Sequence, residues 1–478
     1  MAMALGKRRR ERQEELFIAS DQIRKPESHP FYSRLNQVLD EAGFDRFAET
    51  TCQSFYADKM GRPGLAPGTY FRCLLIGYFE GIDSERGIAW RVRDSLGLRD
   101  FLGFDLSEAT PDHSTISRTR RLVAMEAHQE IFGWVLKQIA QAGLVKGTTI
   151  GIDATTLEAN AAMRTIVRKD TGETYQEFLT RLARESGIET PTREDLARMD
   201  RKREKRMSNR KWMNRNDPDA RIAKMKDGST HMAHKVEHAV DMETGAIIAL
   251  KLQGADLGDT QTIGETLPEA GENIAETAAA VNHEEAGELV NPEGPEAVVT
   301  DKGYHSNAVL MDLEKVEVKS YIPEPDRGKR NWDGKPEEKA AVYSNRRRVN
   351  GAKGKRLLKG RGELLERSFA HMYETGGMRR THLTEHDNIL KRLLVHAAGC
   401  NLGLLMRSMG QAGKPRILQG NPAACYLWFW ARKVGRALTF FKEVLNLAKS
   451  GAVALIGAVT GQRRQWAPFL PAVPEMGL

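Results

Sequence analysis

The chain has 478 residues, enough for two or three domains, and carries 72 Lys and Arg against 64 Asp and Glu, a net charge of +8. This basic excess favours a polyanionic partner. The four cysteines, Cys52, Cys73, Cys400 and Cys425, are widely spaced and include no CxxC pair, which argues against a disulfide framework. The N-terminus lacks the apolar core of a signal peptide, and residues 451–459 are too short an apolar stretch to span a bilayer. We therefore expect a soluble, cytoplasmic protein.

The charge is unevenly distributed along the chain. Residues 198–215 and 346–361 are dense basic runs, whereas residues 269–296 are acidic and predict a loop. Such runs are often solvated loops. Two basic runs that flank strand-like segments nevertheless favour contact with the phosphates of double-stranded DNA.

The first 135 residues predict a helical N-terminal domain. In "ATPDHSTISRTRRLV", Thr110 resembles an N-cap with Pro111 at the first helical position. The helix that follows is crowded with basic residues, namely Arg118, Arg120 and Arg121. Short helices that end in a basic one are typical of a helix-turn-helix-like DNA-binding module. A helical bundle that only braces the next domain is the alternative.

Residues 136–410 predict an α/β domain with a basic insertion at about 160–230, and residues 411–478 predict a helical tail. In chain order we expect a strand at 148–160, a hairpin at 233–253, a helix from 256, a strand at 296–301, a helix at 306–316, a strand at 318–325, and helices at 362–377 and 384–408. Three sequential antiparallel strands followed by strand–helix alternation imply a mixed sheet with helices on its faces. This is the element order of the ribonuclease-H-like fold.

Two aspartates follow apolar strands. Asp153 comes after "TIGI", and Asp301 comes after "AVVT". If these strands are neighbours, both carboxylates emerge at the same edge of the sheet and repel each other unless a cation lies between them. Carboxylate oxygens suit hard cations, so the pattern predicts a site for Mg²⁺ or Mn²⁺.

Glu366 is the best candidate for a third ligand. Leu365, Phe369 and Met372 form a helical stripe, and Glu366 lies roughly 100° around the helix from Leu365, at the rim of that stripe. Glu363 is the competing ligand, and an ordinary solvated glutamate is the other alternative. Two Asp and one Glu can hold two metal ions, an arrangement suited to phosphodiester cleavage or transfer.

Three segments together resemble the catalytic blocks of the DDE transposases of bacterial insertion sequences: "GIDATTLEAN", "VVTDKGYHS" and "ELLERSFAHMYETGGMRRTHL". The resemblance is to the broad family that includes the IS4, IS5 and IS1182-like groups, and it covers roughly residues 63–406. It implies binding of element ends, Mg²⁺-dependent cleavage and strand transfer, with Asp153, Asp301 and Glu366 as the catalytic triad. A homodimer on DNA is expected.

The sequence departs from this family at one position. Many relatives place a basic residue seven positions after the glutamate, where this chain has Tyr373. Arg367, Arg379 and Arg380 are candidates for the missing phosphate contact.

Histidines offer competing interpretations. His231, His234 and His238 suggest a zinc site, but as strand residues they have the wrong reach for a single metal ion, and no Cys is near them in the sequence. His305 lies four residues after Asp301, where it could assist the site or, as we favour, cap the following helix.

Two other functions use the same basic surfaces: an inactive DNA-binding regulator of the element, and a nuclease of the same fold. The aromatic segment that begins at Tyr426 favours packing onto protein over stacking on bases.

Overall fold

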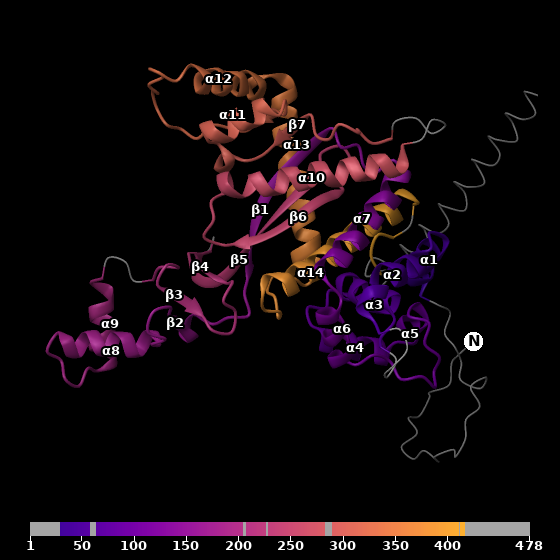
Figure 1. Ribbon diagram of the computed structural model, residues 1–478, viewed down its shortest axis with the longest axis horizontal. Coiled ribbons are helices and arrows are strands. Elements are labelled where there is room, and N and C mark those ends of the chain that lie inside the picture. The colour runs from indigo at the N-terminus through magenta and orange to yellow at the C-terminus, as the bar shows by residue number, and fades with distance from the viewer. Residues whose placement is uncertain are drawn as a thin grey trace, which may run out of the picture. The chain divides into compact units, whose positions relative to one another are not determined.

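The computed structural model describes residues 29–57, 64–203, 207–225, 228–282, 289–410 and 412–415. These residues belong to one compact unit, Met1–Pro415. They form a mixed α/β fold with a mixed sheet and many helices, as the sequence predicts (Figure 1). The predicted helical tail beyond residue 415, with its aromatic segment, lies outside the described residues.

The N-terminal part is helical. Its elements are α1 (Pro30–Glu41), α2 (Phe44–Cys52), the 3-10 turn η1 (Gln53–Phe55), α3 (Pro67–Glu80), α4 (Glu85–Asp94), α5 (Leu96–Phe101), α6 (His113–Leu122) and α7 (Met125–Gln141). Helix α6 starts later than predicted, because its N-cap is Asp112 and not Thr110. The Asp112 carboxylate accepts a hydrogen bond from the Thr115 amide at 2.8 Å. Of its three arginines, Arg118 and Arg121 are exposed, whereas Arg120 is buried and pairs with Glu85.

The sheet has six strands. They are β1 (Thr149–Glu158), β4 (Arg221–Lys224), β5 (Thr230–Asp241), β6 (Ile247–Gly254), β7 (Ala297–Val299) and β8 (Lys319–Tyr321). β1 lies between β5, to which it is antiparallel, and β7, to which it is parallel; β8 extends the sheet in parallel beyond β7. β4 and β6 both pair antiparallel with the outer edge of β5. The predicted hairpin is confirmed as β5 and β6.

The other helices of this part are α10 (Asp259–Val281), α11 (Asn307–Lys315), α12 (Pro336–Asn350), α13 (Ala352–Phe369) and α14 (His386–Ser408), with a 3-10 turn η3 (Lys302–Tyr304) and a π-helical segment η4 (Ala370–Thr375). Successive residues of β5 identify the two faces of the sheet. Glu237 accepts a hydrogen bond from Thr262 of α10, and His238 contacts Ser368 of α13. Because neighbouring strand residues point to opposite faces, α10 and α13 cover opposite faces of the sheet.

The predicted acidic loop is wrong for its first half, because α10 continues to Val281. Ile274, Ala278 and Val281 are buried at a spacing of four and three residues. This apolar stripe explains why an acidic segment is helical: its glutamates take the remaining face.

The segment between β1 and β4 has a small hydrophobic core of its own. It contains β2 (Ile166–Arg168), the 3-10 turn η2 (Met163–Thr165), α8 (Tyr175–Glu185), α9 (Arg193–Arg201) and β3 (Trp212–Asn214). Phe178 and Trp212 pack edge to face in that core. Thr174 and Thr192 each form a capping box at the start of a helix.

Helix α14 joins the N-terminal helices to the sheet. Arg392 donates to the Ile82 carbonyl at 2.9 Å, and Asn401 exchanges two hydrogen bonds with the backbone of Ile247 on β6. Among the described residues, α14 is the one helix long and apolar enough to cross a membrane, but 89% of its apolar window is buried inside the protein. Its apolarity is therefore that of a core helix.

Candidate active site

The register of the sheet brings Asp153 and Asp301 together. β1 and β7 pair in parallel as Thr149 with Ala297, Ile150 with Val298, and Gly151 with Val299. The same offset matches Asp153 with Asp301, two residues after the last of these pairs. β1 continues to Glu158, in agreement with the strand predicted at 148–160, so Asp153 lies inside this strand and does not follow its end.

The Asp153 carboxylate has a partner for each oxygen. Oδ1 accepts from the amide of Ala154 at 2.9 Å, and Oδ2 accepts from Nη1 of Arg361 at 2.7 Å. Burial raises the pKa of this carboxyl group, the ion pair with Arg361 opposes that rise, and the negative charge of Asp301 adds to it. The two aspartates are therefore close enough to act on each other electrostatically.

Asp301 caps a tight turn and has a second carboxylate beside it. Its Oδ1 accepts from the Gly303 amide at 2.8 Å, which opens η3. A Cβ on residue 303 would lie 3.0 Å from Asp301 Oδ1 and 2.3 Å from Asp259 Oδ2. Both carboxylates thus approach the same point, and residue 303 is a glycine because a side chain would meet them.

Asp259 is a site residue that our sequence analysis missed. It lies at the start of α10, and its Oδ1 accepts from Nζ of Lys235 at 2.6 Å. The buried Lys235 also donates to the Leu257 carbonyl and to the Thr262 hydroxyl, so its three N–H groups are all satisfied. In the sequence, Asp259 is the acidic residue of "LGDTQ". An acidic residue in the first turn of a helix is common, so this pattern alone does not indicate a site residue.

Glu366 lies on α13, the helix that carries Arg361. The preceding residue, Leu365, packs against Gly151 on β1, two residues before Asp153. Glu366 is exposed, and no hydrogen bond or ion pair between described residues joins it to either aspartate. Glu363, the competing candidate, is also exposed and pairs with Arg367 at 2.5 Å. The assignment of Glu366 remains a prediction.

Tyr373 has an internal role in this chain. Its hydroxyl lies 2.7 Å from Nε2 of His238, and Nδ1 of His238 lies 3.3 Å from the Ser368 hydroxyl. His238 is opposite Asp153 in the β1–β5 register, and burial lowers its pKa to about 3. The buried Tyr373 therefore helps to hold α13 on the sheet and cannot contact DNA in this structure.

All three candidate replacements for a basic residue at position 373 are paired on the surface. Arg379 pairs with Glu374, and Arg380 lies 3.7 Å from Glu158. Arg367 pairs with Glu363, as above. Exposed pairs of this kind are weak, so all three arginines remain able to exchange a carboxylate for a phosphate.

His305 does not cap the following helix, so that expectation is wrong. The N-cap of α11 is Ser306, whose hydroxyl accepts from the Val309 amide at 3.1 Å. His305 is buried, and neither ring nitrogen has a hydrogen-bond partner among the described residues.

The three histidines of β5 do not converge. His231 lies 3.8 Å from Glu158, His234 is buried against Asp217 at 3.0 Å, and His238 faces α13. The zinc interpretation, already disfavoured, gains no support from this arrangement. More generally, in the part of the chain that the structure describes, no group of three or more His, Cys, Asp or Glu side chains is arranged to hold a metal ion.

The donor chemistry of the Asp153–Asp301 edge nevertheless suits a divalent cation. Two carboxylates face each other there, and Asp259 stands beside one of them. A cation between them would relieve their repulsion, and hard oxygen donors are those that Mg²⁺ and Mn²⁺ prefer. The position on Asp153 Oδ2 is held by the guanidinium group of Arg361, itself a cation.

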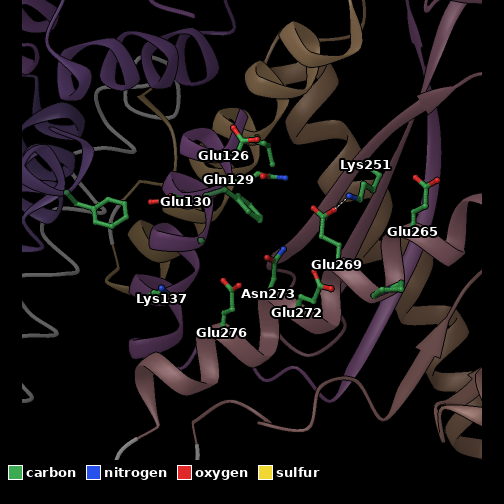
Figure 2. A pocket seen from close by; sticks show the side chains of 15 residues that line it. Glu126, Gln129, Glu130, Lys137, Lys251, Glu265, Glu269, Glu272, Asn273 and Glu276 are labelled. Carbon is green, nitrogen blue, oxygen red and sulfur yellow. Dashed lines mark ion pairs between the residues drawn. The ribbon is translucent and has the colours of Figure 1, made fainter. Parts of the chain in front are cut away.

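A groove of about 780 Å³ lies between α7 and α10, and most of its charged side chains are acidic (Figure 2). Among the described residues, its lining includes six glutamates and two lysines, Lys137 and Lys251. The glutamates are Glu126, Glu130, Glu265, Glu269, Glu272 and Glu276. Lys251 pairs with Glu269 at the groove wall. Such a surface repels a phosphate backbone, so the groove is a poor site for DNA.

The N-terminal part of the chain is similar to a known protein family. Residues 19–122 match a family model described as "Transposase domain (DUF772)". No curated protein and no solved structure matches the chain. The matched residues cover most of the N-terminal helices, α1 to α6, and the match supports a transposase role for the chain.

Proposed function

We propose that this protein is a DDE transposase that binds the ends of its insertion sequence, cleaves them and joins them to new DNA. The observation that carries the proposal is the approach of Asp153 on β1 to Asp301, just after the neighbouring β7, in a chain whose N-terminal helices match a transposase domain. The strand order β6-β5-β1-β7-β8, with β1 antiparallel to β5 and parallel to β7, supports a ribonuclease-H-like catalytic domain.

In this proposal Asp153, Asp301 and Glu366 hold Mg²⁺ or Mn²⁺. The bound ions supply activation of the attacking hydroxyl and stabilisation of the leaving oxygen. Asp301 is positioned by its cap on Gly303, and Asp153 by the rigid centre of the sheet. The π-helical segment after α13 and the His238–Tyr373 contact hold the helix that carries Glu366.

DNA binding is assigned to the basic surfaces. The run at 346–361 covers the end of α12 and the start of α13, and the run at 198–215 covers the end of α9 through β3. In the N-terminal helices, the exposed Arg118 and Arg121 are the candidates for contact with element ends, whereas the buried Arg120 is structural. A homodimer on DNA, acting in the cytoplasm at the nucleoid, completes the proposal.

The test uses the full-length protein with DNA that carries the sequences flanking its gene. A transposase yields Mg²⁺-dependent cuts at the element ends and strand-transfer products in a target plasmid. Cuts without joined products would support the nuclease, and end binding without cuts would support the inactive regulator. The flanking DNA itself should contain terminal inverted repeats and short target duplications.

Recognition of the ends is tested separately. Arg118→Gln with Arg121→Gln should remove the preference for element ends over random DNA in a competition gel-shift, because a basic helix is expected to read or clamp the end sequence. Retained preference in a folded double variant would assign recognition to another region.

A further inference from the structure

Arg361 blocks the carboxylate that the proposed function gives to a metal ion. Its Nη1 lies 2.7 Å from Asp153 Oδ2, and the two side chains are 18% and 24% exposed. The other oxygen of Asp153 accepts from the Ala154 amide. A divalent cation that binds Oδ2 beside the guanidinium group is repelled by its charge, and such a charge-assisted contact at low exposure is not given up without a replacement partner.

One of the two neighbours of Arg361 in the helix faces open space. Arg361 is flanked by Gly360 and Gly362, both inside α13. A Cβ on residue 362 would meet nothing within 4 Å, so internal packing does not account for that glycine. Glycine weakens a helix interior relative to alanine, and its usual compensation is the close approach of another backbone.

The N-terminal half of α13, before Arg361, carries further basic side chains. Lys353, Lys355, Arg356 and Lys359 are exposed, and none of them forms an ion pair within the described residues. These four cations have no carboxylate partner among the described residues and are accessible to phosphates on the exposed side of the helix. Arg361 is the next basic residue after them, at the end nearer to Asp153.

We infer that Arg361 is a DNA-binding residue that exchanges Asp153 for a phosphate of the bound DNA. Without DNA, it neutralises Asp153 and competes with the divalent cation for that carboxylate. When DNA binds along α13, a phosphate takes the guanidinium group, for which its planar fork is well suited, and Asp153 Oδ2 becomes available. The chain thus couples metal binding to DNA binding, and this inference rests on the proposed metal site.

The test measures Mn²⁺ binding and DNA binding separately in the full-length protein. Mn²⁺ binding is followed by the loss of the electron paramagnetic resonance signal of the free ion, with and without an end-bearing duplex whose cleavable strand ends are blocked. DNA affinity is followed by fluorescence anisotropy in EDTA over a series of salt concentrations. Thermal denaturation of each variant confirms that it is folded.

For Arg361→Gln we expect severalfold tighter Mn²⁺ binding without DNA, because the competing cation is gone. DNA binding should weaken, and the slope of its logarithmic salt dependence should fall by about 1, as for the loss of one phosphate contact. In the unsubstituted protein DNA should tighten Mn²⁺ binding, and in Arg361→Gln this enhancement should disappear. Arg361→Lys keeps the charge and should keep most of the DNA affinity.

Arg356→Gln is the matched control, since it removes a cation of α13 that does not touch Asp153. It should lower the DNA salt slope similarly and leave Mn²⁺ binding without DNA unchanged. Unchanged or weaker Mn²⁺ binding in Arg361→Gln would overturn the inference. If Asp153→Asn binds Mn²⁺ as tightly as the unsubstituted protein, the metal site of the proposed function fails instead, so the two failures are distinguishable.

Discussion

Glu237 and Asp153 lie one residue pair apart on the neighbouring strands β5 and β1, yet they face opposite sides of the sheet. On the α10 side, Glu237 is fully buried and accepts hydrogen bonds from the hydroxyls of Thr262, Thr266 and Tyr304. On the α13 side, Asp153 is partly exposed and faces an arginine and a second carboxylate.

Glu237 is held by fixed hydrogen bonds, whereas the ion-pair partner of Asp153 can be replaced by another cation. Three neutral hydroxyl groups from two elements surround Glu237, and no cation is needed to hold it there. Asp153 depends on a long, flexible side chain whose charge another cation can replace. This difference is why we propose the α13 face for metal and DNA binding, whereas Glu237 on the α10 face has a structural role.

Removal of the structural carboxylate should have the largest effect on folding. Glu237→Ala leaves three buried hydroxyls without their acceptor, and we expect the free energy of unfolding to fall by about 3 kcal/mol or more. Urea denaturation measures this change. Glu363→Ala is the control, because its 71% exposed side chain should alter stability by no more than about 0.5 kcal/mol. Equal stability of the two variants would contradict the assignment of Glu237.

The α13 face should be sensitive to acid through His238. Burial lowers its pKa to about 3, so below its unfolded pKa of 6.5 only the unfolded chain takes up this proton. Its contribution to stability is complete above that pH and is lost as pH falls toward 3, at up to about 1.4 kcal/mol per pH unit. In melting curves from pH 7 to 5, His238→Gln should therefore lose less stability than the unsubstituted protein. An identical loss in both would show that His238 is protonated without unfolding.

A smaller effect on stability is expected where the two faces meet, at Gly303. Gly303→Ala places a methyl group against Asp259 and Asp301, and the displaced carboxylates should cost about 1 kcal/mol. Because the same shift moves Asp301, cleavage should fall much more than stability does. Gly264→Ala in α10 is the control, since a Cβ there meets nothing within 4 Å. A Gly303→Ala protein with normal cleavage would show that the turn does not position the site.

The sequence allowed the strands, and the nearness of Asp153 to Asp301, to be predicted because apolar strand patterns are local; the role of these aspartates as metal ligands stays a prediction. The continuation of α10 to Val281 could also have been predicted, although we expected a loop, because Ile274, Ala278 and Val281 keep helical spacing through the acidic run. The approach of Asp259 to Asp301 was not, because it depends on how α10 docks against η3.

The α13 region shows a second feature that could not be predicted from the sequence. In a regular α-helix, position 373 would lie on the same side as the exposed Glu366, but the helix changes to a π-helical segment at Ala370 and Tyr373 is buried. Likewise, the ion pair between Arg361 and Asp153 joins residues 208 positions apart in the chain, and no local pattern indicates which of many arginines would make it.

The most direct test of the catalytic assignment is Mg²⁺-dependent cleavage of end-bearing DNA by Asp301→Asn, with a gel-shift on the same preparation. The asparagine oxygen can still accept from the Gly303 amide, so the turn and the fold should persist. We predict normal end binding and no detectable cleavage, because the charge that would hold the cation is gone while the basic surfaces are intact. Cleavage at the rate of the unsubstituted protein would contradict the account.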